Sequence, residues 1–327
     1  MSWIGVDLGG LRVTTVALDS DGEQLAELSM RTPRSGDRLE VVDVLETAVR
    51  SVVDDADLTM ADVSGVGVAT PGMVVGGTIG GASNVPGWSE RFSLAEMLGD
   101  RLGPPIRLVN DVTAAAVAEH RFGAARGEDD ALVVFAGTGV GAGLILNGGA
   151  YLGGHGGAGE FGHTVVVHNG ATCPCGRRGC VEAYTGRKAM VRTARHAMQQ
   201  GRSTTLFDLA EEQGTREPTS GTFRIALEQG DELVTELLTT AVQVLGAGIA
   251  SVVNLLDVDL VVVGGGLGDE LGDWYRHRVE SAMRPHLFLQ PPTVTMAPAQ
   301  LGAYGGAVGA ATVVHDHVEG RPVSTPA

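Results

Sequence analysis

The three cysteines of the chain lie within eight consecutive positions, and a histidine precedes the first of them by ten residues. The segment reads Gly-Glu160-Phe-Gly-His163, then nine further residues, then Cys173-Pro-Cys175-Gly-Arg-Arg-Gly-Cys180-Val-Glu182. Thiolates and an imidazole at such short spacings suit a tetrahedral Zn²⁺ site better than they suit three unrelated buried thiols. Four protein ligands leave no position for water, so the spacing predicts a structural Zn²⁺ that fixes the loop bearing Glu160, His163 and Glu182.

Two glycine turns, each between apolar strands, have the pattern of phosphate-binding hairpins. The strand at 4–7 ends in Asp7 and leads through Gly9-Gly10 to a strand at 13–18. The pattern returns at 131–146, where Gly137-Thr138-Gly139 separates two further strands. Backbone N–H groups in such turns can receive phosphate oxygens. Either turn alone is a weak signal, but the repetition predicts a duplicated fold whose two phosphate loops face each other across a cleft.

A carboxylate lies where an expected strand meets an expected helix. The strand at 106–109 ends in Asn110-Asp111, and an alanine-rich helix follows at 113–122. Ligands of open α/β folds collect at the carboxyl ends of strands, which favours a chemical role for Asp111. Aspartate is also a common helix N-cap. On these residues alone both interpretations stay open.

The rest of the chain alternates strands with helices. The run Gly264-Gly265-Gly266 fits either close approach to a nucleotide or a left-handed turn. A loop from 76 to 88, with Gly77, Ser83 and Asn84, is either a surface turn or a substrate loop. Hydrophobic periodicity predicts further strands at 25–30, 63–69 and 259–263, and helices at 37–56, 94–102, 187–199, 205–212, 222–228, 231–254 and 299–314. We expect the polar tail from His315 to be disordered.

Composition excludes several classes of protein. The 327 residues are 43% hydrophobic and 19% charged, which is typical of a globular chain long enough for two domains. With 23 basic and 39 acidic residues the net charge is −16, so we expect no nucleic-acid partner. No run approaches twenty uninterrupted apolar residues and the start lacks a signal-peptide pattern, so we expect no membrane partner and a cytoplasmic location.

These motifs resemble the ROK family of bacterial sugar kinases and repressors, within the actin-like sugar kinases. The resemblance covers nearly the whole chain, and its most specific element is the segment from His163 to Glu182. It implies a duplicated ribonuclease-H-like α/β fold, as in actin-like ATPases, with two domains around a cleft. The implied domains are residues 1–112 plus 307–327, with the first phosphate loop, and residues 113–306, with the zinc motif.

The resemblance implies ATP-dependent phosphorylation of the 6-hydroxyl of a hexose, glucose by default, with Asp111 as the general base. It further implies ATP with Mg²⁺ and a structural Zn²⁺ bound by His163, Cys173, Cys175 and Cys180. Sugar-binding positions by resemblance are Gly77, Ser83, Asn84, Asn110, Asp111, Glu160, His163 and Glu182. Nucleotide-binding positions are Asp7, Gly9, Gly10, Arg12, Gly137, Thr138, Gly139, Gly264, Gly265 and Gly266.

One departure from the family pattern concerns the phosphoryl donor. The first loop usually continues Gly-Gly-Thr-Lys, whereas here it reads Gly9-Gly10-Leu11-Arg12. Loss of the hydroxyl predicts altered nucleotide affinity or a donor other than ATP. The alternatives are an amino-sugar kinase, acting on N-acetylmannosamine, N-acetylglucosamine or a 3-amino sugar, and a catalytically silent sugar-binding protein. We do not expect a repressor, because six residues before Asp7 leave no room for a helix-turn-helix domain; a homodimer or homotetramer is expected.

Overall fold

The computed structural model of the chain describes residues 1–35, 37–80, 88 and 90–320. The chain divides into two compact units. Unit 1 comprises Met1–Asp129, Gly143–Gly159 and Gln300–Ala327, and unit 2 comprises Asp130–Ala142 and Glu160–Ala299. The functional domain boundaries expected at residues 112 and 306 stay a prediction.

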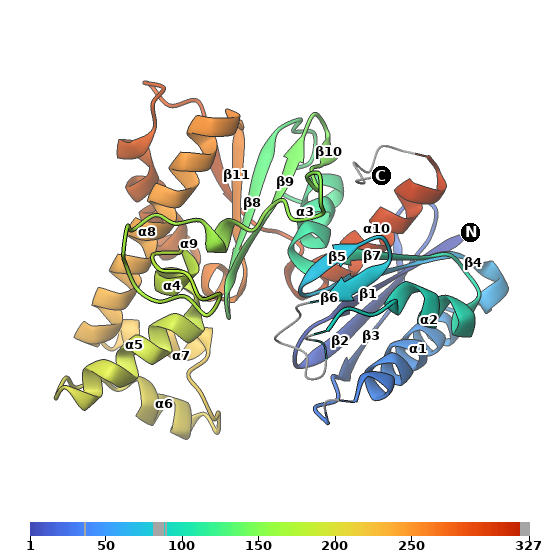
Figure 1. Ribbon diagram of the computed structural model, residues 1–327, viewed down its shortest axis with the longest axis horizontal. Coiled ribbons are helices and arrows are strands. Elements are labelled where there is room, and N and C mark those ends of the chain that lie inside the picture. The colour runs from blue at the N-terminus through green and yellow to red at the C-terminus, as the bar shows by residue number, and fades with distance from the viewer. Residues whose placement is uncertain (36, 81–87, 89, 321–327) are drawn as a thin grey trace. The chain divides into compact units, whose positions relative to one another are not determined.

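Five strands form the first sheet: β1 (Ser2–Leu8), β2 (Arg12–Leu18), β3 (Gln24–Arg31), β4 (Val63–Thr70) and β7 (Ile106–Asn110). Their order is β3-β2-β1-β4-β7 (Figure 1). β2 pairs antiparallel with β1 and β3, whereas β4 pairs parallel with β1 and β7. The parallel pairs bring the carboxyl ends of β1, β4 and β7 to the same edge, where ligands of α/β sheets bind. A short hairpin of β5 (Met73–Val75) and β6 (Thr78–Gly80) follows β4.

Helices cover both faces of the first sheet. α1 (Arg38–Asp55) and α2 (Leu94–Leu102) share one apolar cluster with Ile4, Val6 and Leu8 of β1. α10 (Gly305–Val318) packs on the opposite face with Trp3, and α3 (Asp111–Phe122) packs against α10. Gly5 and Gly67 permit the close approach of α10. A Cβ atom would lie only 1.9 Å from a carbonyl oxygen of that helix at Gly5, and only 1.8 Å from one at Gly67.

The second sheet repeats the topology of the first. Its strands are β8 (Ala131–Ala136), β9 (Val140–Leu146), β10 (Gly149–Ala150), β11 (Leu260–Gly264) and β12 (Thr295–Pro298). Their order is β10-β9-β8-β11-β12, with β11 parallel to both β8 and β12. When the strands of each sheet are numbered along the chain, they therefore lie side by side in the order third, second, first, fourth, fifth. This match confirms the duplicated α/β fold that the two glycine turns predicted.

The α-helices of unit 2 (Figure 1) are α4 (Glu182–Thr185), α5 (Arg187–Gln199), α6 (Leu206–Glu212), α7 (Ser220–Glu228), α8 (Glu232–Leu256) and α9 (Gly266–Met283). Single 3₁₀ turns occur at Met60–Asp62, Phe161–His163, Arg284–His286 and Gly302–Tyr304. α8 has the length and apolarity of a membrane-crossing helix, but half of its most apolar stretch is buried in the unit. It packs against α9 and α4, and its exposed positions include Thr240, Gln243 and Ser251, as in the core helix of a globular unit.

One helix was missed, and the expectation of a disordered tail from His315 was wrong. α9 was not predicted, although Leu267, Leu271, Tyr275, Val279 and Met283 recur every four residues and are buried; its glycine-rich first turn hides that spacing. The last helix begins at Gly305 and continues to Val318, so the tail is helical at His315 where disorder was expected. The His315 ring packs on Trp3 at 4.7 Å between centroids, and Asp316 forms an ion pair with Arg121 at 2.7 Å. These contacts hold the final turn, while residues 321–327 lie outside the described part of the chain.

Candidate functional site

Two candidate carboxylates of unit 1 stand at the carboxyl ends of strands in one sheet. Asp7 is near the end of β1, and Asp111 is the first residue of α3, directly after β7. Asn110 takes the capping role: its side-chain oxygen accepts from the N–H groups of Val112 at 3.0 Å and Thr113 at 3.2 Å. Asn110 is therefore the N-cap of α3, while Oδ1 of Asp111, the first helical residue, also accepts from the N–H of Val112 at 2.9 Å.

The surroundings of Asp7 disfavour its negative charge. Burial, and secondarily the negative charge of Asp111, raise the pKa of Asp7 from 3.8 to about 7. Some of its surface remains accessible to solvent, although protein atoms crowd the carboxylate, and a Cβ added to Gly306 of α10 would lie 2.6 Å from its Oδ2. A carboxyl group with a strongly raised pKa is a recurrent feature of functional sites.

The first glycine turn is a tight hairpin. The N–H of Gly9 donates to the carbonyl of Arg12 at 2.9 Å, and the Thr32 hydroxyl donates to the carbonyl of Gly9 at 2.7 Å. The Leu11 side chain at its tip is 66% exposed. Arg12 Nε donates to the Ser29 hydroxyl at 2.7 Å, so its guanidinium is bound along β3. The turn is thus fixed by its own backbone and by Thr32, with an apolar side chain where the family pattern has a hydroxyl.

The expected substrate loop is only partly described. Gly77 lies in the β5–β6 turn with a positive φ of 77°, and its carbonyl accepts from the N–H of Ala95 at 3.3 Å. Ser83 and Asn84 fall outside the described residues. Asn110 also reaches this region, since its side-chain nitrogen donates to the carbonyl of Gly72 at 3.3 Å.

In unit 2 the four expected zinc ligands converge. The ligand atoms of His163, Cys173, Cys175 and Cys180 all lie within 4.8 Å of one another. Cys175 Sγ is 3.7 Å from Cys180 Sγ, and Cys173 Sγ is 3.7 Å from His163 Nδ1. Zinc–sulfur bonds of about 2.3 Å place neighbouring tetrahedral corners about 3.8 Å apart, so these separations fit a Zn²⁺ centre. A disulfide needs about 2.0 Å between sulfurs, and all three cysteines are free.

The imidazole of His163 links this centre to Glu160. His163 turns Nδ1 toward the thiols, while its Nε2 lies 3.9 Å from Oε2 of Glu160. This separation is longer than a hydrogen bond, so the carboxylate lies next to the imidazole without being bonded to it. Glu160 remains mostly exposed at 57% of its side chain, so it can still meet a ligand.

The second glycine turn is held by the start of α5. The N–H groups of Arg187 and Lys188 donate to the carbonyls of Gly137 at 2.9 Å and Thr138 at 3.2 Å. The Arg187 guanidinium donates to the Thr138 hydroxyl at 3.0 Å. Burial lowers the pKa of Arg187, because removal from water disfavours the charged guanidinium. Glu182, at the start of α4, also bonds to this turn through the N–H of Val140.

The third glycine run forms the N-terminus of α9. Gly265 has a φ of 82°, and a Cβ there would lie 2.8 Å from the carbonyl oxygen of Ala136. The N-cap residue of α9 is Gly265, which has no side chain to bond the first N–H groups of the helix. A helix start of this kind can bind an anion. A Cβ on Gly137 would lie 3.6 Å from the nitrogen of Gly266, so the second glycine turn adjoins the helix start. With φ of 82° and ψ of 164°, Gly265 lies outside the left-handed helical region. The glycine run is therefore not the left-handed turn that was one of its two interpretations.

The chain matches the profile of the ROK family over residues 3–317. The chain belongs to the ROK family. It is 31% identical over 318 residues to a glucokinase of Streptomyces coelicolor, covering 96% of this chain and 97% of that protein. It is 28% identical to an N-acetylmannosamine kinase of Haemophilus influenzae over 329 residues, covering 99% of each chain. A solved ROK glucokinase of Streptomyces griseus, in complex with glucose and AMPPNP, is similar at a TM-score of 0.79 and 31% identity, covering 96% of this chain and 99% of that one.

Within this ROK chain each unit gathers its own part of the expected site. In unit 1, Asp7 and the Gly9-Gly10 turn lie with Asn110 and Asp111 at the carboxyl edge of the first sheet. In unit 2, the zinc motif, Glu160, the second glycine turn and the start of α9 lie together. Arg187 was missed, since its role depends on a tertiary contact with Thr138. The signal available in the sequence was an arginine directly after Gly186 at a predicted helix start.

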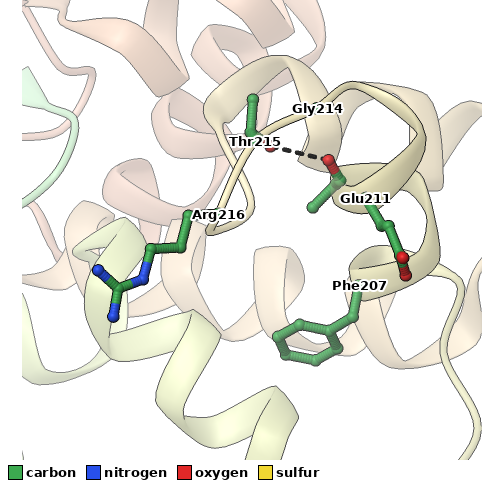
Figure 2. A pocket seen from close by; sticks show the side chains of 6 residues that line it. Phe207, Glu211, Gly214, Thr215 and Arg216 are labelled. Carbon is green, nitrogen blue, oxygen red and sulfur yellow. Dashed lines mark hydrogen bonds between the residues drawn. The ribbon is translucent and has the colours of Figure 1, made fainter.

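A separate hollow of about 530 Å³ lies in unit 2 of the ROK chain (Figure 2). It is open, and its lining includes Phe207, Glu211 and Arg216 but none of the expected site residues. Because the hollow is open to solvent, it lacks the enclosed, convergent polar groups of a substrate site. The glycine turns and the carboxylates, and not this hollow, form the candidate site.

Proposed function

We propose that this ROK chain is a hexokinase-type enzyme that transfers the terminal phosphoryl group of ATP to the 6-hydroxyl of glucose. The observation that carries the proposal is the position of Asp111: it is the first residue of α3, directly after β7, and it is close enough to Asp7 for its charge to act on that carboxyl group. The 31% identity to a glucokinase over almost the full length of both chains supports glucose as the first substrate to test.

In the proposed mechanism Asp111 accepts the proton of the sugar hydroxyl. A primary hydroxyl is a weak nucleophile at neutral pH, so a carboxylate within hydrogen-bond reach must take its proton as attack proceeds. The N–H of Val112 donates to Oδ1 of Asp111 at 2.9 Å and fixes the orientation of the carboxylate. Asp111 would also bind the hydroxyl before transfer, with Asn110, Glu160, His163 and Glu182 assigned to the other hydroxyls by family resemblance.

On the donor side, backbone N–H groups carry the proposal. The turns at Gly9-Gly10 and Gly137–Gly139 and the open start of α9 supply donors for phosphate oxygens, which stabilise charge on the transferred group. Mg²⁺ bound with ATP would supply further neutralisation of the phosphates. Arg187 holds Thr138 in position within the second turn.

A structural Zn²⁺ is part of the proposal, because the four-ligand cluster fits its size and chemistry. His163, Cys173, Cys175 and Cys180 would hold it. Its contribution is rigidity: it fixes His163, and with it Glu160, in the loop assigned to the sugar. We also propose a cytoplasmic enzyme that forms a dimer or tetramer, which light scattering of the purified protein would test.

The test is a coupled assay of ADP release with Mg-ATP and a panel of hexoses and amino sugars. Glucose should turn over fastest, and Asp111→Asn should lower kcat by roughly 10²–10⁴-fold with little change in melting temperature. Asp54→Asn, on the exposed end of α1, is the matched control and should retain full activity.

The panel also decides between the alternatives. Faster turnover of N-acetylmannosamine than of glucose would favour the amino-sugar kinase that the 28% identical relative represents. Turnover with polyphosphate but not with ATP would reassign the donor, in keeping with Leu11 in the first turn. If calorimetry detected sugar binding but no donor gave product, the chain would be a silent sugar-binding protein and the kinase proposal would fail.

A further inference from the structure

Glu182 joins the zinc motif to the second glycine turn. It lies two positions after Cys180, and its Oε2 accepts from the backbone N–H of Val140 at 2.9 Å. A Cβ added to Gly139 would lie only 2.4 Å from the same oxygen. The carboxylate thus occupies the space that a side chain at position 139 would need, and the backbone of the turn packs directly on it.

The residues after Glu182 complete this attachment. A Cβ on Gly186 would lie 3.1 Å from Cγ of Glu182 and 3.4 Å from the Cα of Gly139. The N–H of Arg187 then donates to the carbonyl of Gly137. The glycine turn is therefore fixed by a continuous segment, 182–188, whose first anchoring group is the Glu182 carboxylate.

Only one of the two carboxylate oxygens of Glu182 is used in this way. Among the described residues, Oε1 has no hydrogen-bond partner, and the side chain is half-buried rather than enclosed. A hydroxyl of a sugar could donate to Oε1 while Oε2 keeps the N–H of Val140. One carboxylate can thus bind the sugar through Oε1 and hold the phosphate-binding turn through Oε2.

We propose that Glu182 is a positioning residue for the nucleotide phosphates, and that it couples sugar binding to nucleotide binding within unit 2. The inference rests on the proposed kinase function. A hydroxyl bound at Oε1 restrains the carboxylate, and the restrained carboxylate orders the turn at Gly139-Val140. Each ligand then strengthens the binding of the other by the same factor, as linkage requires.

The decisive measurement is the affinity for Mg-AMPPNP in the absence of sugar, by calorimetry. Glu182→Ala should weaken this binding about tenfold, because the Val140 N–H loses a charged acceptor. Glu182→Gln, which keeps an oxygen acceptor, should stay within about threefold of wild type. Glu212→Ala, at the exposed end of α6, removes the same charge elsewhere in unit 2 and should leave nucleotide affinity unchanged. With saturating glucose, AMPPNP affinity should rise in wild type and not in Glu182→Ala.

A double-mutant cycle tests the contact itself and does not depend on how well one variant folds. Gly139→Ala should weaken AMPPNP binding in wild type, where the new Cβ meets the carboxylate, and less in Glu182→Ala, where it has room. Gly139 does not have a positive φ, so alanine is tolerated by the backbone. Additive effects of the two changes would overturn the inference.

The outcomes separate this inference from the proposed function. If wild type binds AMPPNP and phosphorylates glucose while Glu182→Ala binds AMPPNP equally well, Glu182 serves the sugar alone and the inference fails while the kinase stands. If wild type binds neither AMPPNP nor another phosphoryl donor, the kinase proposal and the inference fail together.

Discussion

The side-chain oxygen of Asn110 lies 3.0 Å from the backbone nitrogen of Val112, across the first residue of α3. Asn110 accepts from the N–H of Thr113 and shares the N–H of Val112 with Asp111, so Asn110 makes the larger contribution to capping. Two adjacent residues of similar shape have separate duties, one in stability and one in the proposed reaction.

This division predicts opposite effects of two alanine substitutions. Asn110→Ala should lower the free energy of unfolding by about 1 kcal/mol, because the cap is lost. Asp111→Ala should change stability much less but should abolish phosphorylation. Urea denaturation and the ADP-release assay on both variants measure the two effects. Equal destabilisation by both changes would mean that Asp111 shares the capping role.

Asp7 should make the folded chain less stable as the pH rises. Its pKa is raised from 3.8 to about 7, so between these values the folded chain holds a proton that the unfolded chain has released. Stability therefore falls as the pH rises through this window and levels off above it. Asp7→Asn should match wild type near pH 4 and exceed it by at least about 1 kcal/mol at pH 7.5.

Urea denaturation of ligand-free protein from pH 4.5 to 8 measures this difference. The same variant should lose kinase activity, because the family resemblance assigns Asp7 to nucleotide binding. A constant difference between Asp7→Asn and wild type across the whole range would show that Asp7 titrates normally in the folded chain.

The zinc cluster predicts one tightly held metal ion for each chain. Cys175→Ser should remove it, because the hydroxyl is a poor replacement for a thiolate in a site with sulfur separations of 3.7 Å. Metal analysis should give about one Zn²⁺ per wild-type chain and far less in the variant. Thr172→Ser, beside the motif, is the control that should keep its metal. A wild-type protein purified without zinc, and unable to bind it when supplied, would contradict the prediction.

The sequence predicted those features whose signal is local. Buried strands between glycine turns, and their repetition, were enough for the duplicated α/β fold, and cysteine spacing was enough to group His163 with the three thiols. The choice for Asp111 between a chemical role and a helix cap could not be made, because aspartate is a common cap and only backbone geometry assigns the cap to Asn110. Arg187 and Glu182 act on the second glycine turn through contacts between segments distant in the chain, which periodicity does not encode.

Glu119 is a buried carboxylate outside the proposed chemistry, and it should be among the most sensitive positions for stability. It is 1% exposed, and its oxygens accept from the backbone N–H groups of Ala124 at 2.8 Å, Gln300 at 2.8 Å and Leu301 at 2.9 Å. These bonds tie α3 to the start of the last segment of unit 1, before α10. The three donors replace water around the charge, which makes its burial tolerable.

Glu119→Gln should lower the free energy of unfolding by about 2–3 kcal/mol, because its NH₂ group faces a backbone donor and leaves that N–H unpaired. Glu96→Gln, on the exposed side of α2, removes the same charge and should cost little. Urea denaturation of the two variants beside wild type gives the comparison. If both glutamines were tolerated equally, the three bonds of Glu119 would contribute no more than solvent does at Glu96.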